Sequence, residues 1–404
     1  MVKTLHPLGE IAARIAEADG DGVSLTHAVD DGPPVDPVEA VKRSLAEPLE
    51  FPPLAAGIVP GDHFAIAVDS DVPCVANIVR GTVEALVAAG VTPEDIAIVT
   101  CDTPTSQLCR DELASAAPGP QFVLHDPSDE QNLCVIGMTK RGVAVRVNRT
   151  LFEADVVLPI GCARVKARGA YESLFPRFFG AETIARYRTP ALQKELAPVK
   201  GKKSAADEAG WMIGPPMIMQ VVPAGNEHVA HVLAGEPRAV ARRAKQLCRE
   251  RWLLHSPQRV GLVVATVTGG SPAQTWANIG RALAMAERVA GEESAMVICS
   301  NLDEPPGRSL GRLVGSDDVV ATQRKISHDH AADTWAAWRL TRALERGPVY
   351  FMSQLSPDTV EDLGLAPVEN IDDLVRLAGR HDSFAVVEDA QHAVVKVDVD
   401  VDDA

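Results

Sequence analysis

The feature that most constrains the fold is an alternation of short apolar runs with longer helical stretches, which begins at residue 64. FAIAVD (64–69) precedes VANIVRGTVEALVAAG (75–90), whose apolar residues recur at helical spacing and whose last residue, Gly90, suits a helix C-cap. The pattern continues with strand-like DIAIVTC, helical SQLCRDELASA, and the strand-like runs FVLHD, VAVRVN and DVVLPIG. Strands separated by helices pair in parallel, so the sequence predicts an α/β protein with mostly parallel, doubly wound sheets.

A second series of strands and helices follows the polar segment HSPQR (255–259). The runs VGLVVATV, AMVICS, VYFMSQ and SFAVVED alternate there with helical stretches such as AADTWAAWRLTRALE. A chain of 404 residues exceeds what one core usually contains. We therefore predict an N-terminal domain over 1–256 and a C-terminal domain over 257–404. The Lys-rich stretch 194–210 is predicted to be a surface loop, and the acidic end 397–404 a solvated tail.

Charge and composition narrow the range of partners. The chain has 39 basic and 55 acidic residues, a net charge of −16, which argues against a nucleic-acid partner but leaves room for a local anion site. No apolar run approaches the ~20 residues that span a bilayer, so no membrane partner is expected. The first residues contain no signal-peptide core, and the seven cysteines are scattered without a CxxC pair. These features favour a cytoplasmic protein with reduced thiols.

Polar residues follow two of the predicted strands, at the sheet edge where ligands of open parallel sheets bind. Asp69 and Asp71 come directly after the first strand, where they either cap the next helix or contact a ligand hydroxyl or a metal. Thr103 and Thr105, in TCDTPTSQ, stand at the entry to the following helix. Helix capping and anion binding by unpaired backbone N–H groups explain that composition equally well.

The strongest site signal is a set of three alternating basic residues, Arg164, Lys166 and Arg168, directly after the strand DVVLPIG. On an extended segment, alternate side chains lie on one side, so their charges would converge. Like charges held together are unfavourable unless an anion lies among them. The sequence therefore predicts a site for a small anion here, with a solvated loop as the alternative.

Other motifs are weaker. TGGSPAQTW (268–276) forms a glycine turn into a helix and could bring the backbone close to a ligand, but it lacks both GxGxxG spacing and a Walker lysine. His328 and His330 flank Asp329 before another helix, which suits an exposed helix start better than a metal site. Neither HExxH nor GxSxG occurs, so zincin and α/β-hydrolase functions have no support.

Several segments together resemble the LarA-type, nickel-pincer lactate racemases. The stretch 39–74, from EAVKRS to DSDVPC, is similar to the opening helix, proline turn and first strand of that family. HDPSDEQNLCVIGMTKRGVAVRVNRTLFEADVVLPIG (125–161) resembles its most specific block, and TGGSPAQTWANIGRALAMA resembles a stretch of its C-terminal domain. The likeness runs from about Val41 to Val387. It implies two α/β domains with an interdomain cleft, hydroxy-acid isomerase activity, a nucleotide tethered through a lysine, and nickel held by that cofactor and one histidine.

The residues that the family's chemistry requires are absent from the matching positions. The family's arginine after the first strand falls on Val72, its first catalytic histidine on Lys166, its tethering lysine near Phe175 and its nickel histidine near Arg188. No lysine occurs between residues 166 and 194, and no histidine between residues 125 and 228. Acid–base work at neutral pH favours histidine, and nickel needs a nitrogen donor. We therefore expect no nickel-pincer nucleotide, no metal and no other cofactor.

Three functions fit this reading. The first is a degenerate family member that binds a small anionic molecule, hydroxy-acid-like or phosphorylated, in the interdomain cleft. Lys166, Arg168 and Arg281 would hold the anion, with Arg281 and Asn278 standing where the family has Lys and Gln. The second is an isomerase or lyase with Lys166 as base and Tyr171 or Glu172 as partner. The third is a non-catalytic scaffold. The arginine replacements favour the first, while catalysis and the oligomeric state stay open.

Overall fold

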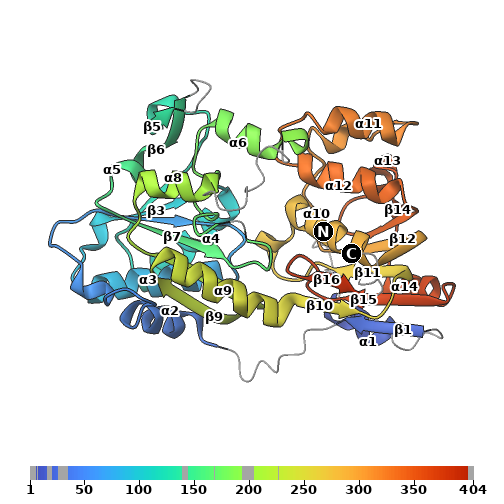
Figure 1. Cartoon of the computed structure of the whole chain (residues 1–404), viewed down its shortest axis with the longest axis horizontal. Helices are drawn as coiled ribbons and strands as arrows, with labels where there is room; N and C mark the ends of the chain where they lie inside the picture. The colour runs from blue at the N-terminus through green and yellow to red at the C-terminus, as the bar shows by residue number, and fades with distance from the viewer. Residues whose placement is uncertain are drawn as a thin grey trace. The chain divides into compact units, whose positions relative to one another are not determined.

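The computed structural model describes residues 6, 8–15, 21–25, 35–138, 144–167, 169–192, 204–225 and 227–398 (Figure 1). The chain forms two compact units. The N-terminal unit comprises 30–187 and 193–249, and the C-terminal unit comprises 1–29, 188–192 and 250–404. The predicted boundary at 257 differs in two respects. The junction lies inside helix α9 (Pro237–Trp252), and β1 (Asp21–Leu25) belongs to the C-terminal unit because it pairs with β15 (Ser383–Val387).

The N-terminal unit contains a six-stranded sheet in the order β4-β3-β2-β7-β8-β9, parallel except for the antiparallel pair β8–β9. Its strands are β2 (Phe64–Val68), β3 (Ile96–Thr100), β4 (Gln121–Leu124), β7 (Val156–Cys162), β8 (Ile218–Gly225) and β9 (His228–Gly235). The chain lays down β2, β3 and β4 in one direction and then places β7 on the other side of β2. The topological switch point of this sheet, where ligands of such folds bind, therefore lies between β2 and β7.

The helices of this unit are α2 (Pro37–Ala46), α3 (Val75–Ala88), α4 (Thr103–Ala116), α5 (Arg149–Glu153), α6 (Ala181–Arg188), α8 (Ala205–Ile213) and most of α9. Helix α3 buries Ile78, Val79, Val83 and Leu86 in the same apolar cluster as β2 and β3, as its helical spacing predicts. Part of the predicted loop 194–210 is instead helix α8, because the Ser204 hydroxyl caps it by accepting from Asp207 N.

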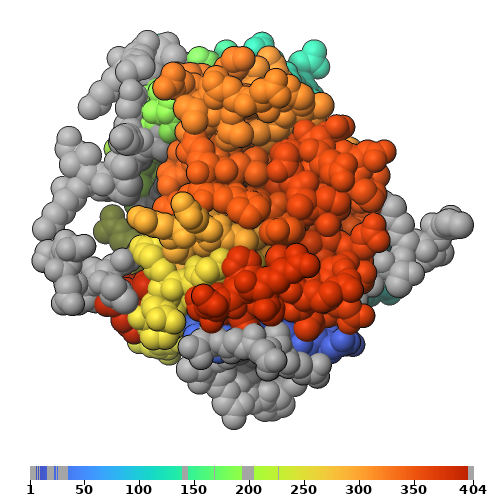
Figure 2. All heavy atoms as spheres, turned by 90° about the vertical axis from the view of Figure 1, so that its right-hand side faces the viewer, coloured from blue at the N-terminus to red at the C-terminus, as the bar shows by residue number. Residues whose placement is uncertain are grey.

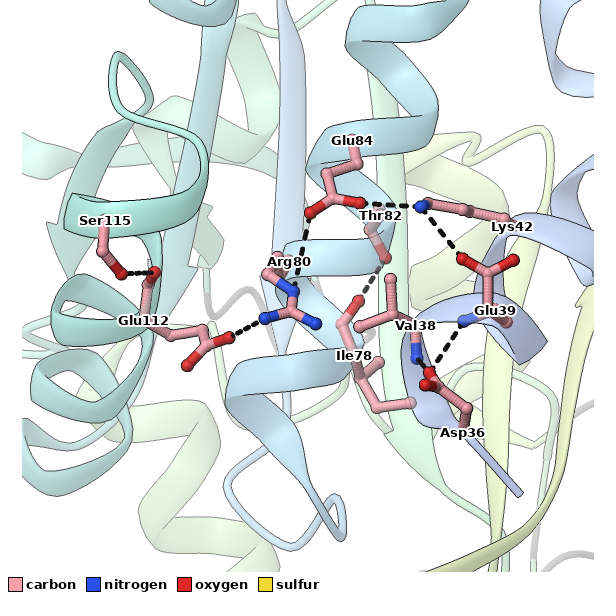
Figure 3. A network of polar contacts seen from close by, with 10 residues as sticks. All are labelled: Asp36, Val38, Glu39, Lys42, Ile78, Arg80, Thr82, Glu84, Glu112 and Ser115. Carbon is pink, nitrogen blue, oxygen red and sulfur yellow. Dashed lines mark hydrogen bonds and ion pairs between the residues drawn. The ribbon is translucent and has the colours of Figure 1, made fainter.

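Three of these helices are joined by a chain of half-buried ion pairs, called here the helix network (Figure 3). Lys42 on α2 contacts Glu84 on α3 at 2.8 Å, and Arg80 on α3 contacts Glu84 at 3.5 Å and also Glu112 on α4. The network ties α2 to α3 and α3 to α4 at the protein surface.

Strands β5 (Leu133–Met138) and β6 (Ala144–Asn148) form a separate antiparallel pair. The prediction that VAVRVN belongs to a parallel, helix-separated series is therefore wrong. Only five residues separate β5 from β6, too few for a parallel crossover. Val147 on β6 packs with Phe175 and Phe179 instead of with the main sheet.

The C-terminal unit contains a six-stranded parallel sheet in the order β1-β15-β11-β12-β13-β14. Its further strands are β11 (Val260–Thr266), β12 (Ala290–Cys299), β13 (Val349–Met352) and β14 (Ala366–Pro367), and β10 (Leu253–Ser256) pairs in parallel with β16 (Val394–Val397). Its helices are α1 (Ile11–Ile15), α10 (Trp276–Val289), α11 (Val319–Ile326), α12 (Thr334–Leu344), α13 (Pro357–Asp362) and α14 (Ile371–Ala378). Figure 2 shows one face of this unit, mostly in orange and red. Within the described ranges, no helix of either unit is long and apolar enough to cross a membrane.

Candidate functional site

The ends of three adjacent strands meet at one edge of the N-terminal sheet. Val68 of β2 pairs with Thr100 of β3 and with Ile160 of β7, so the segments that follow these strands begin side by side. The backbone confirms this alignment, since Asp69 N donates to Ile160 O at 3.0 Å. The polar residues that the sequence places after these strands therefore share the carboxyl edge of the sheet.

Two carboxylates and two arginines form a compact ion-pair cluster at the switch point of this edge, called here the strand-edge cluster. Arg164 Nη2 lies 2.8 Å from Asp71 Oδ2. Arg177 Nη2 lies 2.9 Å from the same oxygen and 3.2 Å from Asp69 Oδ1. Asp71 N also donates to Asp69 Oδ1 at 3.1 Å. Asp69 and Asp71 thus hold arginines; the capping alternative is wrong for them, because α3 has no side-chain cap.

The arginines cover the carboxylates. The side chains of Asp69 and Asp71 are only 7% and 8% exposed, whereas those of Arg164 and Arg177 are 23% and 31% exposed. The four formal charges cancel, so the cluster is neutral as a whole. A molecule approaching from solvent meets guanidinium N–H groups before it meets a carboxylate oxygen.

Burial and neighbouring charges shift the protonation equilibria of the cluster. Burial raises the pKa of Asp69; Arg177 opposes this shift, and the carboxylate of Asp71 adds to it. Burial acts to lower the pKa of Arg164 and of Arg177, but the adjacent carboxylates outweigh it and raise both. Both guanidinium groups therefore stay charged.

The predicted convergence of Arg164, Lys166 and Arg168 rests on an extended segment that the structure replaces with a turn. Ala167 N donates to Arg164 O at 3.3 Å, which closes the turn. Arg164 reaches Asp71, while Lys166 is exposed. Arg164 and Lys166 therefore do not lie on an extended segment as predicted, and Arg164 joins the strand-edge cluster. Arg168 lies outside the described residues.

The entry to α4 is a capped helix start. Asp102 Oδ1 accepts from Thr105 N at 2.8 Å, which confirms capping at this point; Thr103 is exposed and Thr105 fully buried. Three buried oxygens here have no hydrogen-bond partner among the described residues: Thr100 Oγ1, Asp102 Oδ2 and Thr105 Oγ1. The helix start therefore leaves buried acceptor capacity beside the strand-edge cluster.

The histidine that follows β4 is locked inside the unit, which the sequence did not reveal. His125 is 5% exposed, and its Nδ1 accepts from Asn148 Nδ2 at 3.2 Å. Its Nε2 therefore carries the proton and donates to Phe179 O at 3.1 Å. Burial lowers the pKa of His125, although the bond to Phe179 O opposes the shift. A neutral ring with both nitrogens occupied is a structural group and not an acid–base catalyst.

The segment around Phe175 contributes aromatic packing and one residue of the strand-edge cluster. The Phe175 ring lies 4.8 Å from that of Phe179 and 4.6 Å from that of Tyr187, centroid to centroid. The Tyr171 ring is half-buried against Gly210, and burial raises its pKa; Glu172 is also half-buried. Arg177, in the middle of LFPRFF, was missed from the sequence. An arginine inside such an apolar run needs a buried partner, and that is the signal that could have found it.

Asn278 and Arg281 lie in the C-terminal unit. Asn278 is 4% exposed and its Nδ2 donates to Ala273 O at 2.8 Å, while its Oδ1 accepts from Arg281 Nη1. Asn278 N is also bound by the cap of α10, Thr275 Oγ1, at 3.3 Å. Asn278 therefore connects the glycine turn to α10. The half-buried Arg281 side chain lies against Asn278.

Metal ligation was one alternative for the acidic and histidine residues. Asp329, between His328 and His330, pairs instead with Arg312 at 2.6 Å. In the part of the chain that the structure describes, no group of three His, Cys, Asp or Glu side chains could hold a metal ion. This observation concerns sites built from protein ligands alone.

Comparisons with known proteins place this geometry in context. Residues 9–172 match the family model of the lactate racemase N-terminal domain, and a comparison with curated proteins finds no match. The structure is similar to the lactate racemase apoprotein from Thermoanaerobacterium thermosaccharolyticum, with a TM-score of 0.72 and 16% identity over 94% of this chain and 95% of that one. It is also similar to a Thermotoga maritima protein solved by the Northeast Structural Genomics Consortium, with a TM-score of 0.66 and 14% identity over 90% of this chain and 100% of that one. At such identities the structural likeness establishes the fold.

Proposed function

Because this chain is a member of the lactate racemase-like family, we propose that its strand-edge cluster binds a small organic anion without the family's nickel-pincer chemistry. The ligand class is a hydroxy acid or a small phosphorylated molecule. The observation that carries the proposal is the outward position of Arg164 and Arg177 over two buried carboxylates at the switch point of the sheet.

The hydrogen-bonding capacity of the two arginines supports this assignment. Each guanidinium has five N–H donors, and among the described residues the hydrogen bonds to Asp71 come from Nη2 of each arginine. The remaining donors suit the two oxygens of a carboxylate or phosphate, which arginine binds in a bidentate manner. Because the cluster is neutral, affinity comes from directed hydrogen bonds and not from excess positive charge. The carboxylates fix both guanidinium groups in place before the ligand arrives.

The residues at the matching positions do not fit the family's cofactor. The tethering lysine of the resemblance falls near Phe175, whose ring is 6% exposed and packed between Phe179 and Tyr187. The nearest lysine earlier in the chain, Lys166, is exposed in the turn after β7. His125 has both ring nitrogens engaged. These observations support binding without a covalent nucleotide or nickel, and we derive no chemical step through either.

The lysine-based isomerase or lyase receives less support. A catalytic lysine is commonly activated by desolvation, whereas the side chain of Lys166 is exposed. Its proposed partner Tyr171 packs against Gly210. None of the seven cysteines forms a disulfide, and a cytoplasmic location is part of the proposal.

Isothermal titration calorimetry with L-lactate, D-lactate and inorganic phosphate tests the proposal. We expect at least one of these anions to bind, and Arg164→Met to weaken that binding by about 1.5–3 kcal/mol, the range for a hydrogen bond to a charged group. Arg164→Lys should recover only part, because an ammonium lacks the bidentate fork. Arg80→Met, the same change in the helix network, is the matched control and should bind like the wild type. Equal affinities for wild type and Arg164→Met would remove the strand-edge cluster from the site.

A further inference from the structure

A cavity lies in the C-terminal unit, near the ends of β13 and β14 (β14 is labelled in Figure 1). Its volume is about 340 Å³, which falls in the range of cavities that hold small organic ligands. Phe351, Val360 and Val368, all buried, supply an apolar floor. His6, Ser353, Gln354 and Glu369 supply polar groups. The cavity combines an apolar body with a few polar contacts, as small-molecule sites do.

His6 is a fixed part of this lining. Its backbone N donates to Asn301 Oδ1 at 2.7 Å, and Asn301 Nδ2 donates to His6 O at 3.2 Å. Its ring Nε2 lies 3.0 Å from the carbonyl oxygen of Ser353. A carbonyl oxygen only accepts, so Nε2 carries the proton and Nδ1 of the neutral ring is an acceptor. In this tautomer the acceptor nitrogen is Nδ1, which the Ser353 carbonyl does not engage.

Glu369 adds a negative charge to the same lining. It is exposed, and within the described ranges no ion pair to this carboxylate occurs. Among the lining residues that the structure describes, none is a lysine or an arginine. Acceptors without a compensating cation are complementary to a ligand that donates hydrogen bonds and carries positive charge. This requirement is opposite to that of the strand-edge cluster, where donors face solvent.

We propose that this cavity binds a small primary amine with an apolar body. The ammonium group is held by the Glu369 carboxylate and His6 Nδ1, and the apolar part packs on Phe351, Val360 and Val368. The amine keeps its proton and no covalent step is involved. The site belongs to the C-terminal unit alone, so the proposal does not depend on anion binding in the N-terminal unit.

The test uses the full chain and a matched series of probes, followed by saturation-transfer NMR and calorimetry. 2-Phenylethylamine is the test probe, 2-phenylethanol its neutral analogue and 3-phenylpropionate its anionic analogue. We expect saturable binding of the amine, at least tenfold weaker binding of the alcohol, and no binding of the carboxylate. Glu369→Gln should weaken amine binding at least tenfold. Glu361→Gln removes an exposed carboxylate from α13 that does not line the cavity, and it should leave amine binding unchanged.

Three results would overturn the proposal. They are the absence of saturable amine binding at millimolar concentration, equal binding of the amine and the carboxylate, and an unchanged amine affinity in Glu369→Gln. Because Glu369 is exposed, its substitution should leave the melting temperature near that of the wild type, so a loss of binding reports on the site and not on unfolding.

Discussion

The N-terminal unit contains two ion-pair networks whose carboxylates differ in burial. In the helix network, the side chains of Arg80, Glu84 and Glu112 are 28–30% exposed and those of Lys42 are 38% exposed (Figure 3). In the strand-edge cluster, the carboxylates are 7% and 8% exposed beneath their arginines. When charged side chains that water can reach pair with each other, they give up water contacts, so the net free-energy gain is small. A buried carboxylate that loses its partner, by contrast, stays desolvated without compensation, which destabilises the fold. Burial, and not the number of ion pairs, therefore decides which network the fold depends on.

The two networks also differ in the role that we assign to each: the helix network supports the fold, and the strand-edge cluster is the proposed ligand site. The helix network joins α2, α3 and α4 and pairs its charges with one another. The strand-edge cluster lies at the switch point of the sheet and holds two guanidinium groups in fixed positions with donors to spare. Fixed donors at a ligand-binding edge are what an anion site requires.

The largest effect is expected when Arg177 is replaced by methionine. This change removes a side chain that contacts both Asp69 and Asp71. We expect a loss of about 3 kcal/mol in the free energy of unfolding, the lower end of the range for a broken buried pair, because Arg177 is 31% exposed. Urea denaturation measures it. A loss no larger than that of Arg80→Met would erase the contrast between the two networks.

A smaller effect, confined to mildly acidic pH, is expected from His125. Burial lowers the pKa of His125 below 6.5. At mildly acidic pH this histidine is therefore protonated in the unfolded chain but still neutral in the folded protein. The stability that this group contributes is complete above 6.5 and falls as the pH drops from 6.5 toward the lowered value. Asp69, with its raised pKa, acts in the opposite sense.

Comparison of wild type with His125→Gln isolates the histidine from Asp69. We expect the free energy of unfolding of the variant to fall less between about pH 7.5 and about pH 5, a window centred on the titration of an ordinary histidine. Chemical denaturation at a series of pH values gives the result. Parallel pH profiles for the two proteins would show that His125 does not titrate differently on folding.

The smallest effect is expected in the helix network. Arg80→Met should lower the free energy of unfolding by about 1 kcal/mol or less, as for other ion pairs that water can reach, and the difference should shrink further in high salt. Denaturation at low and high ionic strength checks both points. A loss that is large and insensitive to salt would mean that this network is coupled to the core.

The sequence predicted the fold well where periodicity decides it. The buried run 64–68 and the helix after it lie where their patterns place them. VAVRVN was assigned to the wrong sheet, because the apolar pattern of a strand does not determine which strand it pairs with. At the site, Asp69, Asp71 and Arg164 were found because they follow strands, but their mutual pairing was not. Arg177 and His125 depend on contacts between distant segments, which local spacing cannot encode.

The central proposal is that this strand edge does not support the nickel-pincer chemistry of lactate racemases. The most direct test is intact-mass and metal analysis of the full chain, purified after co-expression with the enzymes that make the family's cofactor. With Phe175 packed at the position of the tethering lysine and His125 locked, we expect the unmodified polypeptide mass and no stoichiometric nickel. A covalent nucleotide adduct with one nickel per chain would contradict the account.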